Sequence, residues 1–185
     1  MVEMSGIDLK NALPSRLETE RLTLRPPMRG DALALVEQAN NYKVARMLKR
    51  MPHPYGRADA IGFIEVVAQR ESERAYIVCS KRGTLVGVAS FMFADGYPPE
   101  IGYWFGESFW GRGYASEVVA AMLVAARATG HFPVICAQVL AHNYASARVL
   151  EKAGFGRTHT SVDAVGNNRG KSVIHFRLET AEEAA

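Results

Sequence analysis

Hydrophobic and polar positions in the first third of the chain follow two different spacings. Residues 21–26 alternate between polar and apolar and end at a proline, which predicts a short, half-buried strand. Asp31 then precedes an apolar-rich stretch, so we expect a helix with Asp31 as its N-cap. A second helical pattern covers residues 57–70, with its apolar side chains on one face.

Strand patterns dominate the middle of the chain. Residues 74–80 and 84–93 predict two strands joined by a short turn around Gly83. Residues 100–105 predict the next strand, and an alanine-rich helical pattern covers residues 113–128.

The last third of the chain continues this mixture. Residues 132–140 predict a buried strand, and residues 171–179 predict a final one. Between them, residues 143–155 predict a helix with Asn143 as its N-cap and Gly154 just past its end. Strands and helices mix without alternating regularly, which indicates an α+β fold with one central, right-handed parallel crossover.

Composition supports one ordinary globular domain over residues 1–185, with loose ends at about 1–12 and 181–185. The chain is 48% hydrophobic and 22% charged. A net charge of +3 gives no reason to expect nucleic-acid binding. No apolar run approaches the ~18 residues of a membrane span, and no signal pattern opens the chain, so we expect a cytoplasmic protein. Cys79 and Cys136 lie in separate apolar runs and are expected to be reduced core residues.

A glycine-flanked arginine at residues 111–113 stands between a predicted strand and a predicted helix. Glycines let the backbone approach a ligand, and the free N–H groups of a helix start favour phosphate. Arg112 adds a positive charge; the alternative is a structural turn with an ordinary surface arginine. A dinucleotide fingerprint fails because Ser116 replaces its third glycine. The stretch 166–172, GNNRGKS, is one residue too short for a Walker loop, and a strand pattern follows it.

Four segments together carry a resemblance to a known family. They are LETERLTLRP, TLVGVASF, EIGYWFGESFWGRGYASEVV and NYASARVLEKAGF. In this order and spacing the chain resembles the GNAT acetyltransferase superfamily, in the branch of the ribosomal-protein N-terminal acetyltransferases. The resemblance implies a twisted mixed sheet of about six to seven strands with helices on both faces. It also implies that the fourth strand, EIGYWF, and the fifth, PVICAQVL, splay apart.

The same resemblance implies acetyl-CoA as co-substrate. Its pyrophosphate would be bound by the backbone amides of Gly111, Arg112, Gly113, Tyr114, Ala115 and Ser116. Trp110 stands where the superfamily pattern has Gln or Arg, which leaves backbone binding intact. Backbone groups near Trp104 and Phe105 would pair with pantetheine in the gap between the strands. Asn143 would cap its helix and contact the cofactor or the splayed strand.

Amine acetylation requires that a proton leave the amine before attack. Glu100, which opens the fourth strand, is the candidate base; the alternative is a strand-end residue bound to backbone or solvent. Many relatives protonate the thiolate with a tyrosine, but Leu150 occupies that position. Ser146, one turn earlier, is the candidate acid, and water or a packing role for Ser146 are alternatives. The cysteines lack an activating neighbour and the histidines lack metal-ligand spacing, so we expect direct transfer in a ternary complex without a metal.

The acceptor is less constrained by the sequence. Residues 40–55 and 161–171 would border its cleft by resemblance. The branch favours a protein or peptide N-terminal α-amine. A small-molecule amine, such as an amino acid or an antibiotic-like compound, remains an alternative, as does a CoA-binding regulatory module without efficient catalysis. Relatives occur as monomers and homodimers, and the sequence does not choose between them.

Overall fold

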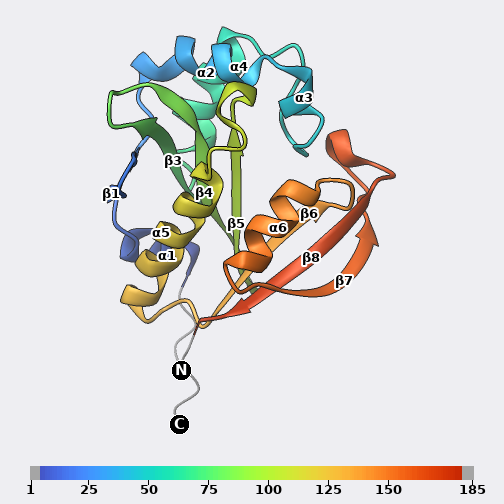
Figure 1. The fold of residues 1–185 in the computed structure, drawn as a ribbon. Coiled ribbons are helices and arrows are strands. Elements are labelled where there is room, and N and C mark those ends of the chain that lie inside the picture. Colours follow the sequence, from blue (N-terminus) through green and yellow to red (C-terminus); the bar gives the residue numbers. More distant parts are fainter. Residues whose placement is uncertain (1–4, 181–185) are drawn as a thin grey trace.

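A mixed sheet runs through the computed structural model, which describes residues 5–180 (Figure 1). Within those residues it has eight strands in the order β1-β2-β3-β4-β5-β6-β8-β7. Their bounds are Leu17–Glu18, Leu22–Arg25, Glu73–Ser80, Leu85–Ala94, Tyr97–Phe105, Val134–Leu140, Gly156–Val162 and Ser172–Glu179 for β1 to β8. Neighbouring strands are antiparallel except β5 and β6, which are parallel as the sequence predicted.

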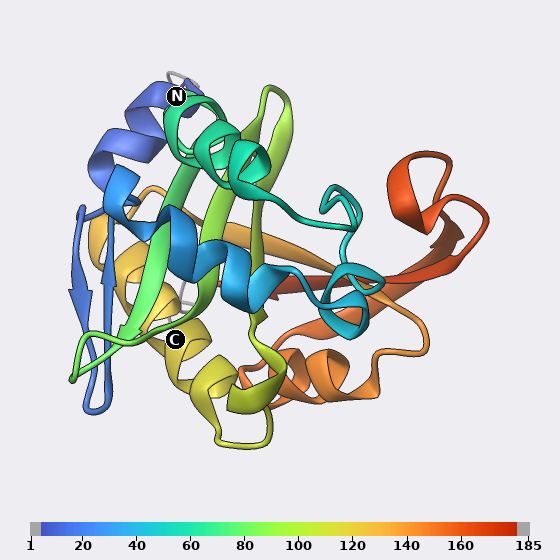
Figure 2. The same ribbon diagram turned by 90° about the horizontal axis from the view of Figure 1, so that it is seen from above.

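Helices cover both faces of the sheet (Figures 1 and 2). Their bounds are Gly6–Ala12, Ala32–Ala39, Tyr42–Ala45, Arg57–Gly62, Tyr114–Thr129 and Tyr144–Lys152 for α1 to α6. Helices α5 and α6 lie on one face, and α2, α3 and α4 lie on the other. Among the described residues, none of the helices could cross a lipid bilayer.

Side-chain alternation along β5 connects the two hydrophobic cores. Ile101 and Phe105 pack into the core formed with α5 and α6, whereas Trp104 packs against the core formed with α2, α3 and α4. Because successive residues of a strand point to opposite faces, Glu100 lies on the same face as Trp104. Strand β5 therefore presents different chemistry to the two sides of the sheet.

The expected divergence of the two central parallel strands is confirmed. In the described part of the chain, β5 and β6 pair at one register position, Glu100 opposite Cys136. On its other edge β5 pairs with β4 along most of its length. Toward the C-terminal end of β5, the two strands separate (Figure 1). The gap that opens between them is closed at the Glu100 end.

The strand count exceeds the expected six to seven by one or two. Strand β7 was not apparent in the sequence because nearly all of its residues are exposed, so it shows no apolar alternation. Strand β1 has two residues, too few for a pattern.

The chain start differs from the expected loose end. Ser5 and Asp8 form a reciprocal capping box that begins α1. Lys10 Nζ donates to the carbonyl oxygen of Arg70 at 2.5 Å, and the guanidinium of Arg74 donates back to the carbonyl oxygen of Lys10. These bonds attach α1 to the sheet. Residues 1–4 and 181–185, the remainder of the expected loose ends, lie outside the described residues.

The predicted N-cap role of Asp31 is wrong. The Asp31 carboxylate makes no capping bond to α2. It instead pairs with the guanidinium of Arg25 at 2.6 Å and accepts from the backbone N–H of Met28 at 2.8 Å. A 3-10 turn over Arg29–Asp31 enters the helix directly, so Asp31 already has helical dihedrals and cannot cap.

Candidate active site

The glycine-flanked turn delivers the chain from β5 into α5. Gly111 and Gly113 have φ angles of 71° and 77°, in the left-handed region that side chains disfavour. The first backbone hydrogen bond of α5 runs from Glu117 N to Gly113 O. Within residues 5–180 the amides of residues 111–116 donate to no protein acceptor. A row of free N–H groups therefore meets the positive end of the helix dipole, which is suited to an anion.

An ion pair with Arg21, in the turn between β1 and β2, fixes this helix start. Arg21 Nε donates to Glu117 Oε2 at 2.6 Å, and the Arg21 backbone N–H donates to Glu117 Oε1 at 2.9 Å. Thr19 Oγ1 donates to the same carboxylate at 2.5 Å. Burial acts to raise the pKa of Glu117, but the bonds from Thr19 and Arg21 lower it below its ordinary value. Arg21 also donates to the carbonyl oxygen of Arg112 at 2.9 Å and stacks 4.9 Å from the Tyr114 ring.

Side chains of the turn fold back onto the protein. The Trp110 indole N–H donates to the Phe105 carbonyl oxygen at 2.7 Å, which ties the turn to the end of β5. The Arg112 guanidinium lies 5.5 Å from the centre of the Phe109 ring. The donors that the turn leaves available to an anion are therefore its backbone amides, while the Arg112 guanidinium is partly engaged by the Phe109 ring.

The edge of β5 that faces the gap can be assigned from its hydrogen bonds. Gly106 N donates to Val86 O at 3.0 Å, and Trp104 pairs in register with Val88 of β4. Because backbone groups alternate between the two edges of a strand, Tyr103 and Phe105 turn theirs toward the gap. The Phe105 carbonyl already accepts from Trp110, so its N–H and the backbone of Tyr103 remain for a ligand.

The Tyr103 hydroxyl lies near this gap, in contact with the start of α6. Tyr103 Oη donates across the gap to the Ser146 carbonyl oxygen of α6 at 3.3 Å, and burial raises the pKa of Tyr103 to about 12. Asn143 caps α6 as predicted, accepting from Ser146 N at 3.2 Å. Leu150 of α6 is fully buried and has no hydroxyl. The phenol in this region comes instead from Tyr103 of β5. The sequence analysis did not identify Tyr103. It could have been noticed as a residue with a hydroxyl group on the core-facing side of β5, between Ile101 and Phe105.

Glu100 lies at the closed end of the gap and is partly buried. Gln138 Nε2 of β6 donates to Glu100 Oε2 at 2.8 Å. Burial raises the pKa of Glu100 above its ordinary value, while the Gln138 bond and the charges of Lys49 and Arg50 act to lower it. The carboxylate is thus a stronger base than a free glutamate, and its orientation is fixed.

The two segments expected to border an acceptor meet in the structure. Asn167 N donates to the Lys49 carbonyl oxygen at 3.0 Å, and Lys49 Nζ pairs with Asp163 at 2.8 Å. Lys171 Nζ donates to the Arg46 carbonyl oxygen at 3.4 Å. These contacts join the loop before α4 to the loop between β7 and β8 (Figure 1).

A histidine pair lies further along the same face of the sheet. The rings of His159 and His175 stack at 4.1 Å and 9°, and His175 Nε2 lies 2.7 Å from Ser161 Oγ. Burial and the neighbouring His159 lower the pKa of His175. Gln138 is in register with His175, so its side chain lies between Glu100 and the pair. Among the described residues, no three acidic, histidine or cysteine side chains cluster as metal ligands would.

Both cysteines are free, and burial raises the pKa of each thiol. Cys79 is buried as expected, whereas Cys136 is partly exposed where β5 and β6 meet. A raised pKa favours the thiol over the nucleophilic thiolate.

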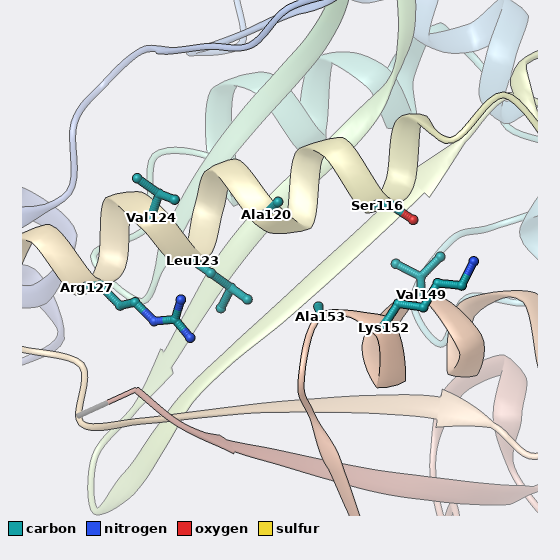
Figure 3. A pocket seen from close by; sticks show the side chains of 8 residues that line it. All are labelled: Ser116, Ala120, Leu123, Val124, Arg127, Val149, Lys152 and Ala153. Atoms are coloured by element: carbon teal, nitrogen blue, oxygen red, sulfur yellow. The ribbon is translucent and has the colours of Figure 1, made fainter. Parts of the chain in front are cut away.

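A groove of about 250 Å³ separates α5 from α6 (Figure 3). Its lining is mainly apolar and includes Leu123, Val124 and Val149. Ser116 stands at the end of the groove nearest the glycine turn, and Arg127 and Lys152 lie along it. The groove thus begins at the first turn of α5, while Glu100 lies on the other face of the sheet.

Comparison with known proteins places this geometry in context. A family model described as an acetyltransferase (GNAT) domain matches residues 21–156. A relative from Bacillus licheniformis, the uncharacterized N-acetyltransferase p20, is 28% identical over 144 residues, which cover 75% of this chain and 81% of the relative.

Solved structures agree with the fold. A GNAT-family acetyltransferase from Bacillus anthracis superposes with a TM-score of 0.79 at 23% identity, over 90% of this chain and 99% of that one. RimL, a ribosomal L7/L12 α-N-protein acetyltransferase solved with coenzyme A, superposes with a TM-score of 0.77 at 20% identity, over 90% of this chain and 97% of that one. Spermidine N-acetyltransferase from Vibrio cholerae, solved with CoA and spermine, superposes with a TM-score of 0.74 at 19% identity, over 88% of this chain and 97% of that one.

Proposed function

Because the chain belongs to the GNAT acetyltransferase family, whose domain model spans residues 21–156, we propose that it acetylates the α-amine of a protein or peptide N-terminus. Acetyl-CoA is its co-substrate, as in the family. The observation that carries the proposal is the placement of Glu100 at the closed end of the β5–β6 gap, with the free amides of residues 111–116 beyond the open end.

Binding of the co-substrate rests on backbone groups. The amides of residues 111–116 and the helix dipole hold the pyrophosphate, and Arg112 adds charge. Pantetheine lies in the gap, where Tyr103 and Phe105 offer backbone groups; the Trp104 backbone instead faces β4. Asn143 holds the start of α6 beside it.

Transfer is direct. Glu100 accepts the proton of the acceptor ammonium, itself or through a water, and the amine nitrogen attacks the thioester carbonyl carbon. A C–N bond forms and the C–S bond breaks, releasing CoA as a thiolate that takes a proton from Ser146 Oγ. The second proton of the attacking nitrogen leaves as the amide forms and returns through water to Ser146 Oγ, so the products are the amide, CoA thiol and protonated Glu100. Tyr103, protonated with a pKa of about 12, is the second hydroxyl in reach of that region. The raised pKa of both cysteine thiols argues against an acetyl-cysteine intermediate.

A peptide acceptor is supported by two observations. RimL, an α-N-protein acetyltransferase, shares the fold over nearly the whole of both chains. Spermidine acetyltransferase shares it too, but here Lys49 and Arg50 place positive charge at Glu100, which disfavours a polycation.

The test is release of free CoA from acetyl-CoA with a panel of peptides, amino acids and polyamines, followed by mass analysis of the product. We expect a mass shift on the peptide α-amine, formed much more slowly by Glu100→Gln. Turnover with small amines alone would overturn the peptide assignment. Tight acetyl-CoA binding without turnover of any acceptor would instead identify a CoA-binding module.

A further inference from the structure

The two loops that meet over the acceptor side carry a concentration of positive charge. We call residues 46–53 and 163–171 together the basic arch. Its charged side chains are Arg46, Lys49, Arg50, Asp163, Arg169 and Lys171. Five are basic and one is acidic, a formal charge of +4, whereas the entire chain has +3. The charge is therefore local to these loops and not a general property of the surface.

Backbone contacts make the arch one structural unit. Besides the bond from Asn167 N to Lys49 O, the Asn167 side-chain amide donates to the carbonyl oxygen of Leu48 at 3.2 Å. Gly166 has a φ of 65°, and a Cβ there would lie 2.3 Å from the Lys49 carbonyl oxygen. The loops are thus packed too closely for any side chain at Gly166, and the positions of the basic groups are set by the fold.

Most of the positive charge in the arch is uncompensated. Lys49 pairs with Asp163, and this bond lowers the pKa of Asp163. Among the ion pairs of residues 5–180, none involves Arg46, Arg50, Arg169 or Lys171. The charges of Lys49 and Arg50 also act on Glu100, so the arch borders the proposed site of proton transfer.

We infer that the basic arch recognises acidic side chains in the first residues of a peptide acceptor, an inference that rests on the proposed acetyl transfer at Glu100. Uncompensated charges at the mouth of a cleft raise the local concentration of oppositely charged substrates and disfavour like-charged ones. The N-terminal amine reaches Glu100, and the acidic residues that follow it lie under Arg50, Lys171 and their neighbours. A polyamine is positively charged, so the same basic side chains would repel it.

Polar groups beyond Glu100 fit an extended peptide better than a compact ligand. On the exposed face of β6, β7 and β8, Gln138, His175 and Ser161 offer hydrogen-bonding groups in a row that leads away from Glu100. Peptide main chain supplies alternating N–H and C=O partners for such a row. The basic groups are likewise distributed over two loops, which matches charges spread along a chain.

The test compares kcat/KM for short peptides that share one N-terminal residue and differ downstream, where they carry Asp and Glu, Asn and Gln, or Lys. We expect each acidic residue to raise kcat/KM up to about fivefold over its amide counterpart at low salt. Lysine peptides should be slowest. Raising salt from about 20 mM to about 300 mM should erase most of the difference, because the screening length shortens.

Variants locate the effect. Arg50→Ala and Lys171→Ala, singly and together, should reduce the ratio of acidic to amide peptide rates toward one. Taking a ratio within each variant cancels any change in Glu100 itself. Arg29→Ala is the matched control, because Arg29 is an exposed arginine before α2, at the opposite end of that helix from the arch. It should leave the ratio unchanged.

Equal rates for acidic and amide peptides would overturn the inference while leaving peptide acetylation intact. An unchanged ratio in the double variant would also overturn it. Absence of turnover with every peptide would remove the proposed function as well, and a panel of carboxylated and phosphorylated small amines would then show whether the arch serves a small anionic acceptor.

Discussion

Arg21 holds Glu117 with two hydrogen bonds, from its Nε at 2.6 Å and from its backbone N–H at 2.9 Å. Glu117 belongs to the first turn of α5, where its negative charge would oppose a bound pyrophosphate. Arg21 neutralises that carboxylate, and through the Arg112 carbonyl it also fixes the turn. An arginine from the turn between β1 and β2, remote in sequence, therefore stabilises the proposed anion site without being one of its free donors.

Arg21→Ala should raise KM for acetyl-CoA about tenfold, since a charge-assisted hydrogen bond contributes about 1.5 kcal/mol. Steady-state kinetics at saturating acceptor measure the effect. KM for the acceptor should stay near its wild-type value, and Arg29→Ala should change neither constant. An unchanged KM for acetyl-CoA would show that the ion pair is purely structural.

Gly113→Val should weaken acetyl-CoA binding more than Arg112→Ala. At a φ of 77° a side chain costs about 1–2 kcal/mol of strain, which displaces the amides of the turn. Calorimetric titration with acetyl-CoA measures both variants. Gly96→Val is the matched control, with a φ of 75° in the β4–β5 turn, and should lower stability while leaving the Kd unchanged. Loss of binding in Arg112→Ala with retention in Gly113→Val would reverse the assignment.

Glu100→Gln should lower kcat/KM by about a hundredfold or more with the true acceptor, while the Kd for acetyl-CoA stays unchanged. In the wild type, Gln138 stabilises the charged carboxylate, so Gln138→Leu should raise the pKa of Glu100 further. The acidic limb of the pH–rate profile would then move to higher pH. A profile that stays in place would exclude Glu100 as the titrating base.

The same carboxyl group should reduce stability at neutral pH. Its folded pKa is raised above the unfolded value by burial, so its contribution is fully favourable below the unfolded pKa and is lost as pH rises through the folded pKa. Glu100→Gln is therefore expected to raise Tm at pH 7 but not at pH 3. Thermal unfolding at both pH values provides the comparison, and an equal shift at the two would contradict it.

Ser146→Ala should lower kcat about tenfold if its hydroxyl protonates the departing thiolate, with KM for acetyl-CoA unchanged. Tyr103→Phe removes the neighbouring phenol and should have the smaller effect. The opposite order would assign the proton to Tyr103, which the structure places across the gap from α6. A wild-type kcat in both variants would indicate that water protonates the departing thiolate.

Local patterns predicted most of the elements, because buried strands and capped helices leave periodic signals. Strand β7 has no such signal, since its side chains face solvent. The cap prediction for Asp31 was wrong because a 3-10 turn leads directly into α2. The glycine turn and the Asn143 cap were recognisable from short stretches, and the catalytic role of Glu100 stays a prediction. The Tyr103–Ser146 contact and the Arg21–Glu117 pair were not, because each joins residues separated by 43 and 96 positions respectively.

The bond between Leu48 and Asn167 spans 119 positions of the chain. Closing so long a loop is entropically expensive and is repaid only once β8 has joined the sheet. The helix start proposed to bind acetyl-CoA also depends on a distant contact, between Arg21 and Glu117, but α5 buries six of its side chains in the core. The arch consists of loops whose residues are mostly exposed, and such segments open more easily than a packed helix. We therefore expect the arch to open at a lower free energy than the core in native-state hydrogen exchange. Recognition of the acceptor would then be the first capability that the protein loses under mild denaturation, and the last that it gains on folding.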